Sequence, residues 1–428
     1  MPDEKLPLIL HPGSGLARVG PQGGRIVAEM VEKALALSRA AEKGKTPRME
    51  QLSTLAAAHL AKTTPKQPTP LGPRFRIGEH VFYEPDFQQI RLWAKALELE
   101  PETVIERMLI EMKPEWDQEI KTQFANGRII RLCWDIGLLP LVSFEWVDGL
   151  GIESIAFLVG SQPDLTERSL SLPLPELRRL DCDNMGLIRL NLSAVPKLTR
   201  LECSENQLTR LNLSAVPQLT KLSCPNNRLN ELDLSAVPHL SELLCWNNQL
   251  SSLELSAVPR LTGLACGDNQ LSSLNLSTVH QLTFLECRIN RLSKLDLSAV
   301  PRLTRLACGD NQLSSLDLST VHQLTELSCF GNQLTELDLS VVPQLTKLNC
   351  HSNRLTEIDL SAVPKLTSIL CPKNQFTELD LFPVPLVKEL WCFDNKLTNL
   401  DIRPLKQLEK LHYDAEKTRL IKRPDQNF

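Results

Sequence analysis

The sequence predicts a solenoid, in which short repeats of equal length stack along one axis. Eleven cysteines follow one another at intervals of 21 residues, from Cys182 to Cys392. An asparagine follows the cysteine by three residues in ten of these repeats. Because only a stack of equivalent units repeats its chemistry at a fixed distance along the chain, these two spacings indicate the fold class.

Each repeat is expected to consist of short extended segments joined by turns. The block 198–218 reads LTRLECSENQLTRLNLSAVPQ and represents the others. Apolar residues occupy positions 1, 4, 6, 11, 14 and 16 of the repeat and usually position 19, and the L-x-C and L-x-L steps alternate as in β-strands. The Ser-Ala-Val-Pro run is too short for a long helix and predicts a tight turn or a single 3₁₀ turn.

The asparagines and cysteines are expected to point into the core. An unpaired buried amide costs about 1–3 kcal/mol, so the asparagines should bond to backbone groups of neighbouring turns and form a ladder. The eleven cysteines should behave as small apolar side chains. Thiols in register on parallel strands have poor geometry for disulfides, so we expect reduced cysteines and a cytoplasmic location.

The repeats resemble the leucine-rich repeat family, whose pattern L-x-x-L-x-L-x-x-N/C-x-L they match with cysteine in place of the third leucine. The resemblance covers residues 177–407, and the 21-residue, cysteine-containing unit is similar to bacterial, internalin-like repeats. It implies an α/β solenoid: a right-handed superhelix with a parallel β-sheet on its concave face, and protein binding on that face. The region before the repeats, where a small helical region is expected, has no such resemblance.

The remaining residues divide into segments on both sides of the repeats. The predicted organisation is a disordered N-terminus (1–22), a helical segment (23–62), a Pro-rich linker (63–74), a mainly helical adaptor or cap (75–127), degenerate capping repeats (128–176), eleven repeats (177–407) and a C-terminal cap (408–428). Within the adaptor, helices are predicted over 86–99 and 102–112. The capping repeats are predicted from three apolar triads, which begin at Ile129, Leu141 and Ile152.

Two of the repeats are nearly identical. Blocks 261–281 and 303–323 differ at only two positions, which indicates an internal duplication of 42 residues. Both carry a histidine in place of the usual proline, at His280 and His322. We expect these to be surface residues rather than metal ligands, because the turn between them offers Pro301 and no ligand.

Composition limits the classes of function. The chain of 428 residues has a net charge of −4 and 42% hydrophobic residues, which suits an ordered core and argues against a nucleic-acid binder. It has no stretch of about 18 apolar residues, so we expect no membrane span. No basic segment precedes the apolar run at 6–10, so we expect no secretory signal.

The variable positions beside the strand framework predict a partner-binding surface. In leucine-rich repeats such positions face the concave side, and here they are positions 2, 3, 5, 7 and 8. Exposed aromatic residues on this face would be hot spots for a protein partner, or would instead pack across a neighbouring strand or against a folded-back N-terminal segment. The predicted partner-binding residues are Arg179, Arg200, Lys221, Trp246, Phe284, Arg288, Arg305, Phe330, His351, Trp391 and Phe393.

The sequence favours a non-enzymatic scaffold or adaptor that binds a protein and that docks a second component on its N-terminal helical region, without metal or other cofactor. The alternative is an effector or defence-system component in which residues 1–127 carry an unrecognised activity. Cys133-Trp134-Asp135 resembles the active motif of bacterial effector ubiquitin ligases that also carry leucine-rich repeats. However, Asp135 has the wrong charge to activate a thiol, so we predict no catalytic residues.

Overall fold

The structure is a computed structural model that describes residues 74–109, 123–125, 128–135, 150–158 and 168–428. All of them belong to one compact unit that spans residues 73–428. The segments predicted at 1–22 and 23–62, and nearly all of the linker, lie outside the described residues. No helix in the described part of the chain is long and apolar enough to cross a membrane.

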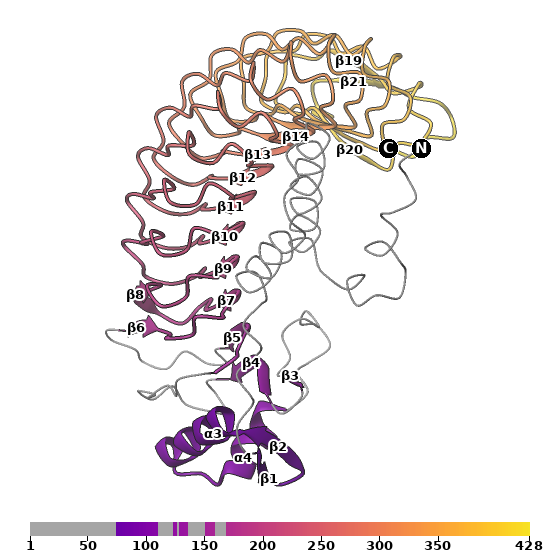
Figure 1. The fold of residues 1–428 in the computed structure, drawn as a ribbon. Helices are drawn as coiled ribbons and strands as arrows, with labels where there is room; N and C mark the ends of the chain where they lie inside the picture. The colour runs from indigo at the N-terminus through magenta and orange to yellow at the C-terminus, as the bar shows by residue number, and fades with distance from the viewer. Residues whose placement is uncertain (1–73, 110–122, 126–127, 136–149, 159–167) are drawn as a thin grey trace, which may run out of the picture. The chain divides into compact units, whose positions relative to one another are not determined.

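A 15-stranded sheet extends through the repeats (Figure 1), in the order β20-β18-β17-β16-β15-β14-β13-β12-β11-β10-β9-β7-β5-β4-β3. Neighbouring strands are parallel except for the antiparallel pair β3 and β4. The strands are β3 (Gln123–Ala125), β4 (Arg128–Asp135), β5 (Ser154–Leu158), β7 (Arg179–Asp181), β9 (Arg200–Glu202), β10 (Lys221–Ser223), β11 (Glu242–Leu244), β12 (Gly263–Ala265), β13 (Phe284–Glu286), β14 (Arg305–Ala307), β15 (Glu326–Ser328), β16 (Lys347–Asn349), β17 (Ser368–Leu370), β18 (Glu389–Trp391) and β20 (Lys410–His412). The parallel-sheet solenoid predicted from the repeats is therefore confirmed.

In the 15-stranded sheet, each strand from β7 to β20 is three residues long and occupies positions 3 to 5 of its repeat. The leucine at position 4 is buried, and residues 3 and 5 point to the other side of the sheet because side chains alternate along a strand. The chain then bends at position 8, where φ is positive even in residues other than glycine, such as Ile289 at 53°. This bend ends the strand and directs the chain into the rest of the turn.

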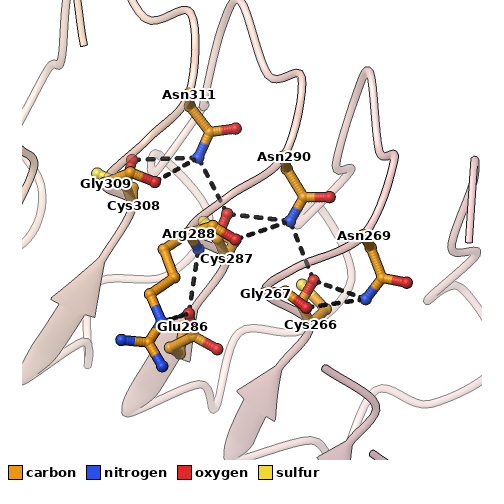
Figure 2. Close-up of polar contacts among 10 residues, drawn as sticks. All are labelled: Cys266, Gly267, Asn269, Glu286, Cys287, Arg288, Asn290, Cys308, Gly309 and Asn311. Atoms are coloured by element: carbon orange, nitrogen blue, oxygen red, sulfur yellow. Dashed lines mark hydrogen bonds and ion pairs between the residues drawn. The ribbon is translucent and has the colours of Figure 1, made fainter. Parts of the chain in front are cut away.

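The predicted asparagine ladder is confirmed (Figure 2). Asn290 Nδ2 donates to the carbonyl oxygens of Cys266 at 3.0 Å, Cys287 at 3.1 Å and Arg288 at 3.2 Å, and its Oδ1 accepts from the Leu271 backbone N–H at 2.9 Å. Because one amide bonds to its own turn and to the preceding one, successive repeats are joined through their core. The same pattern recurs from Asn206 to Asn395.

The eleven cysteines from Cys182 to Cys392 are free and buried. Burial raises the pKa of these thiols, for example to about 12 in Cys224 and Cys329. The thiols are therefore protonated at neutral pH and contribute packing volume, as small apolar side chains do.

The Ser-Ala-Val-Pro segments are turns, as predicted, and each is held by a side chain at position 15. Asp338 Oδ1 accepts a hydrogen bond of 2.8 Å from the Ser340 backbone N–H. Hydrogen bonds from the Ser340 hydroxyl and from this N–H lower the pKa of Asp338. The threonines at position 2 have a structural role as well. Thr304 Oγ1 donates to the Thr283 carbonyl oxygen at 2.9 Å, so these hydroxyls join the repeats and are not free to bind a partner.

The first described residues, 74–108, form a hairpin and two helices. The hairpin consists of β1 (Arg74–Ile77) and β2 (His80–Tyr83), and it is followed by α3 (Glu84–Leu97) and α4 (Pro101–Met108). The helix predicted at 86–99 thus begins and ends two residues earlier, because Glu98 adopts a left-handed conformation (φ 54°) that terminates α3. Residues 110–112 of the other predicted helix lie outside the described residues.

A buried ion pair joins α3 to the sheet. The Asp86 carboxylate is fully buried, and its Oδ2 lies 2.6 Å from Nε of Arg128 on β4. Its Oδ1 accepts from the Ile129 backbone N–H at 3.0 Å. Burial raises the pKa of Asp86 in spite of these two favourable contacts.

The first apolar triad lies on β4, and the third begins at Ile152, two residues before β5, and continues into it, where Ile155 pairs with Leu132. The triad at 141–146 lies outside the described residues. Two smaller parallel pairs lie near the two ends of the repeats, β6 (Arg168–Ser171) with β8 (Leu187–Asn191) and β19 (Asn399–Asp401) with β21 (Arg419–Ile421).

At the C-terminal end, Gln426 Nε2 donates to the carbonyl oxygens of Ile402 and Leu405, each at 2.9 Å. This side-chain amide bonds to the last core carbonyls as the asparagines do in the repeats.

Candidate functional site

We define the strand face as the outward side chains at positions 3 and 5 of β7 to β20, together with the residues at position 7. All eleven predicted partner-binding residues lie at these positions. The exposed members are Lys221, Trp246, Arg288 and Arg305, and the half-buried members are Arg179, Arg200, Phe284, Phe330, His351, Trp391 and Phe393. The position-8 residues, which the sequence also assigns to this surface, form the backbone bend that follows each strand.

Many charges of the strand face are paired with charges on neighbouring strands. Lys221 Nζ lies 2.8 Å from Glu242 Oε2, and Lys347 Nζ lies 2.8 Å from Glu326 Oε1. Exposed pairs of this kind contribute about 0–1 kcal/mol each to stability. They do reduce the number of isolated charges that the face presents to a ligand.

A hollow of about 230 Å³ lies on the strand face between β13 and β17. Its floor carries the short side chains of Ala307, Ser328 and Asn349 at position 5. Phe284 and Leu370 line its two ends, on the first and last of these strands. This is the candidate functional site, because it is a concave area with an apolar surface on an otherwise charged sheet.

Two aromatic contacts adjoin the hollow. The Arg305 guanidinium carbon lies 4.7 Å from the centroid of the Phe284 ring, a cation–π arrangement. At position 7, the rings of Phe330 and His351 are stacked with centroids 4.6 Å apart. Partial burial lowers the pKa of His351, so its ring is neutral at pH 7. Phe330 also lies over Gly309, where an added Cβ would be 2.5 Å from a ring carbon.

A second aromatic group lies at the C-terminal end of the strand face. Trp391 is 6.5 Å from Phe393 and 4.7 Å from His412, measured between ring centroids. Trp391 Nε1 is buried and has no hydrogen-bond acceptor among the described residues. Trp246, 36% exposed, is the other tryptophan on this surface.

The N-terminal end of the strand face is acidic. Burial, together with the charges of Asp183 and Glu202, raises the pKa of Asp181 to about 7. Arg200 Nη2 lies 2.5 Å from Glu202 Oε1 and neutralises that carboxylate. Among the described residues, no group of three or more His, Cys, Asp or Glu side chains is arranged to hold a metal ion.

Asp181→Asn is expected to stabilise the protein at pH 8 and to have little effect at pH 4. The folded-state pKa of Asp181 is raised, so the native state binds more protons than the unfolded state between about pH 4 and 7, and stability falls as pH rises through this window. Asparagine removes the charge and keeps the oxygen that accepts from the Asp183 N–H at 3.3 Å. The measurement is the melting temperature of both proteins from pH 4 to 8; an equal difference at both ends would contradict the assignment.

A larger cavity lies on another face and is a weaker candidate. It has a volume of about 1,060 Å³ and is formed by positions 12 to 15 of the C-terminal repeats, with carboxylates such as Glu336, Glu357 and Asp359. The carboxylates at position 15 already cap turns, as Asp359 does by accepting from the Ser361 N–H at 2.8 Å. The carboxylates at position 15 thus have a local structural role.

The chain folds as a leucine-rich repeat solenoid of 21-residue, cysteine-containing repeats, and it is similar in fold to bacterial internalins and to YopM. Residues 322–363 match the family model described as Leucine Rich repeats (2 copies). Such solenoids are generally modules for protein interaction, because stacked repeats create extended binding surfaces.

Among solved structures, the functional domain of InlJ from Listeria monocytogenes, which includes a cysteine ladder, is 36% identical with a TM-score of 0.55. That match covers 56% of this chain and 54% of the InlJ chain, so this chain spans about half of its length. An internalin (inlF) from the same species is 20% identical, with a TM-score of 0.57 and coverage of 67% and 87%. YopM, a leucine-rich effector protein from Yersinia pestis, is 21% identical, with a TM-score of 0.53 and coverage of 86% and 100%.

The similarities to inlF and to YopM, at 20% and 21% identity, concern the fold alone. The comparison with curated proteins found no match. Cys133, the residue of the alternative ligase hypothesis, lies on β4, and its side chain is outside the part of the chain that the structure describes.

Proposed function

We propose that this protein is a non-enzymatic scaffold or adaptor that binds a protein partner on its strand face, between Trp246 and Phe393. The observation that carries the proposal is the hollow bounded by Phe284 and Leu370, beside the stacked pair of Phe330 and His351. Aromatic side chains next to an apolar depression are typical of the anchor regions of protein interfaces.

The size of the surface supports a protein rather than a small ligand. Eight repeats lie from Trp246 to Phe393, and three outward positions in each give about 24 side chains, which agrees with the ~20–30 residues per side of a standard interface. The distance is about 34 Å, from seven strand steps of ~4.8 Å. The proposal assigns no catalysis to the repeats, because their cysteines are buried and protonated.

Replacing Trp246, Phe330 and Phe393 together by alanine is expected to abolish partner binding and to leave the fold intact. Binding is measured by capture of proteins from the native lysate on the tagged full-length chain, with quantification of each captured protein. Circular dichroism and a melting curve check the fold. The matched control replaces Glu336, Glu357 and Glu378, which lie on another face, by alanine. A partner that is lost with the control and kept with the aromatic variant would refute the strand-face proposal.

We also propose a cytoplasmic location, since a reducing compartment preserves free thiols. Fractionation of native cells tests this, and recovery of the protein outside the cytoplasmic fraction would exclude it.

A further inference from the structure

The hollow on the strand face results from a local run of short side chains. At position 5, Ala307, Ser328 and Asn349 stand on three successive strands, β14, β15 and β16. The strands on either side carry the longer side chains of Glu286 and Leu370 at the same position. The sheet is therefore open over three strands, or about 14 Å, and walled on both sides.

The surface of the hollow is mainly apolar. Ala307 supplies an apolar side chain on the floor, and Phe284 and Leu370 supply apolar side chains at the two ends. Asn349 Oδ1 already accepts from the His351 N–H at 3.4 Å. An apolar group that covers this apolar lining would gain about 25 cal/mol for each Å² that it buries.

The volume decides between a small molecule and a side chain. Pockets that hold small molecules measure about 300–1,000 Å³ and cover most of the ligand. The hollow, at about 230 Å³, is smaller than this range and open to solvent along the sheet. It suits one large side chain that projects from a partner.

The charges on the rim indicate what should lie beside that side chain. Lys347 is neutralised by Glu326 at 2.8 Å. Arg305 is exposed, is held over the Phe284 ring at 4.7 Å, and forms no ion pair with any residue that the structure describes. An arginine whose position is fixed by an aromatic ring loses little conformational entropy when it binds a carboxylate.

We infer that the hollow over Ala307, Ser328 and Asn349 is an anchor pocket for one large apolar side chain of the protein partner, with an acidic residue next to it that pairs with Arg305. This inference rests on the proposed function and specifies the chemistry that the strand face recognises. The expected recognition element is a Trp, Phe, Leu or Met residue with an Asp or Glu residue directly before or after it.

Ser328→Leu is the test variant, because it fills the hollow. The chain itself shows that the fold accepts leucine at this position, since Leu244 and Leu370 occupy it on β11 and β17. Ser223→Leu is the matched control, with the same substitution at the same repeat position outside the hollow. Arg305→Gln removes the charge on the rim and keeps a polar side chain of similar reach.

The probe is a phage-displayed library of random 12-residue peptides, selected on the immobilised full-length protein, with affinities of the enriched peptides measured by fluorescence anisotropy. The enriched peptides should contain the apolar–acidic pair. Ser328→Leu should weaken their binding about 10-fold or more, and Ser223→Leu less than about 2-fold. Arg305→Gln should weaken it about 3- to 10-fold and reduce its dependence on salt.

Enriched peptides that lack the pair, or that bind Ser328→Leu as tightly as the wild type, would overturn the inference, as would a selection that enriches no peptide. The triple alanine variant at Trp246, Phe330 and Phe393 separates this failure from failure of the proposed function. Peptides that lose binding to the triple variant but not to Ser328→Leu leave the strand face as the binding surface and remove the anchor pocket. Peptides that bind both variants as tightly as the wild type contradict both proposals.

Discussion

Asn290→Asp is expected to destabilise the protein by about 3–5 kcal/mol at pH 7, as an uncompensated buried charge does. The change replaces an amide donor by a carboxylate that would face the carbonyl oxygens of Cys266, Cys287 and Arg288 at 3.0–3.2 Å. Protonation relieves this repulsion, so the folded-state pKa of the new carboxyl should lie above its unfolded value. The loss of stability should therefore become smaller as pH falls toward 4.

Urea denaturation at pH 5 and pH 7 measures this effect, with Asn290→Ala as a second variant. Alanine should cost less, about 2–4 kcal/mol, because Cys266 O keeps its bond from Asn269 and only the Leu271 N–H loses its sole side-chain acceptor. The control is Gln270→Ala, which removes an exposed amide and should change stability by less than about 0.5 kcal/mol. A cost for Asn290→Asp that does not depend on pH would show that the carboxyl escapes to solvent.

Asp86→Ala is expected to release α3 and α4 from the sheet while the repeats stay folded. The variant removes the carboxylate oxygen that lies 2.6 Å from Arg128 Nε and the oxygen that accepts from the Ile129 N–H at 3.0 Å. Loss of one member of a buried pair costs about 3–5 kcal/mol. Because stability in a solenoid is a sum over neighbouring units, this cost should stay local.

Hydrogen exchange measured by mass spectrometry resolves this outcome. Residues 84–108 should exchange roughly 100-fold faster in the variant, and residues 200–400 should be unchanged. Asp86→Asn is the milder comparison, because its amide oxygen can still accept from the Ile129 N–H. Equal protection of α3 in the wild type and in Asp86→Ala would show that the ion pair does not hold the helix.

The periodicity of the sequence predicted the repeat fold closely because each repeat bonds mainly to its two neighbours. Once Cys266, Cys287 and Cys308 are recognised as equivalent, the register of the sheet follows, and so do the inward cysteines and asparagines. The role of position 8 did not follow. Seven of the eleven residues at this position are Asn, Asp or Gly, which adopt positive φ readily, but Ile289 and Lys373 adopt it as well. The repeat therefore imposes the bend even where the residue does not favour it.

The candidate site was predicted only in part. Repeat register places Phe330 and His351 at the same position of adjacent repeats, but their stacking depends on side-chain rotamers and on the space over Gly309. The hollow was missed because its floor consists of inconspicuous residues. The signal was present in the sequence as Ala307, Ser328 and Asn349 at successive position-5 sites, and it becomes meaningful only beside the longer neighbours.

Before the repeats, the sequence located α3 and α4 within a few residues but gave no partner for Asp86. The residues that meet there, Asp86 and Arg128, are separated by 42 positions without any periodic relation. Such a contact depends on tertiary packing, which local pattern does not encode.

Because the register between repeats is constant, this protein can evolve by the gain or loss of whole repeats. Every turn makes the same backbone and amide bonds to the next, so gain or loss of 21 residues leaves each remaining bond intact. The near-identity of blocks 261–281 and 303–323 is the expected trace of such an event. Unequal recombination would therefore move Phe284 relative to Leu370 in steps of about 4.8 Å without disturbing the core, whereas point mutation changes one outward side chain at a time. Ligand preference and folding can thus evolve almost independently in this chain.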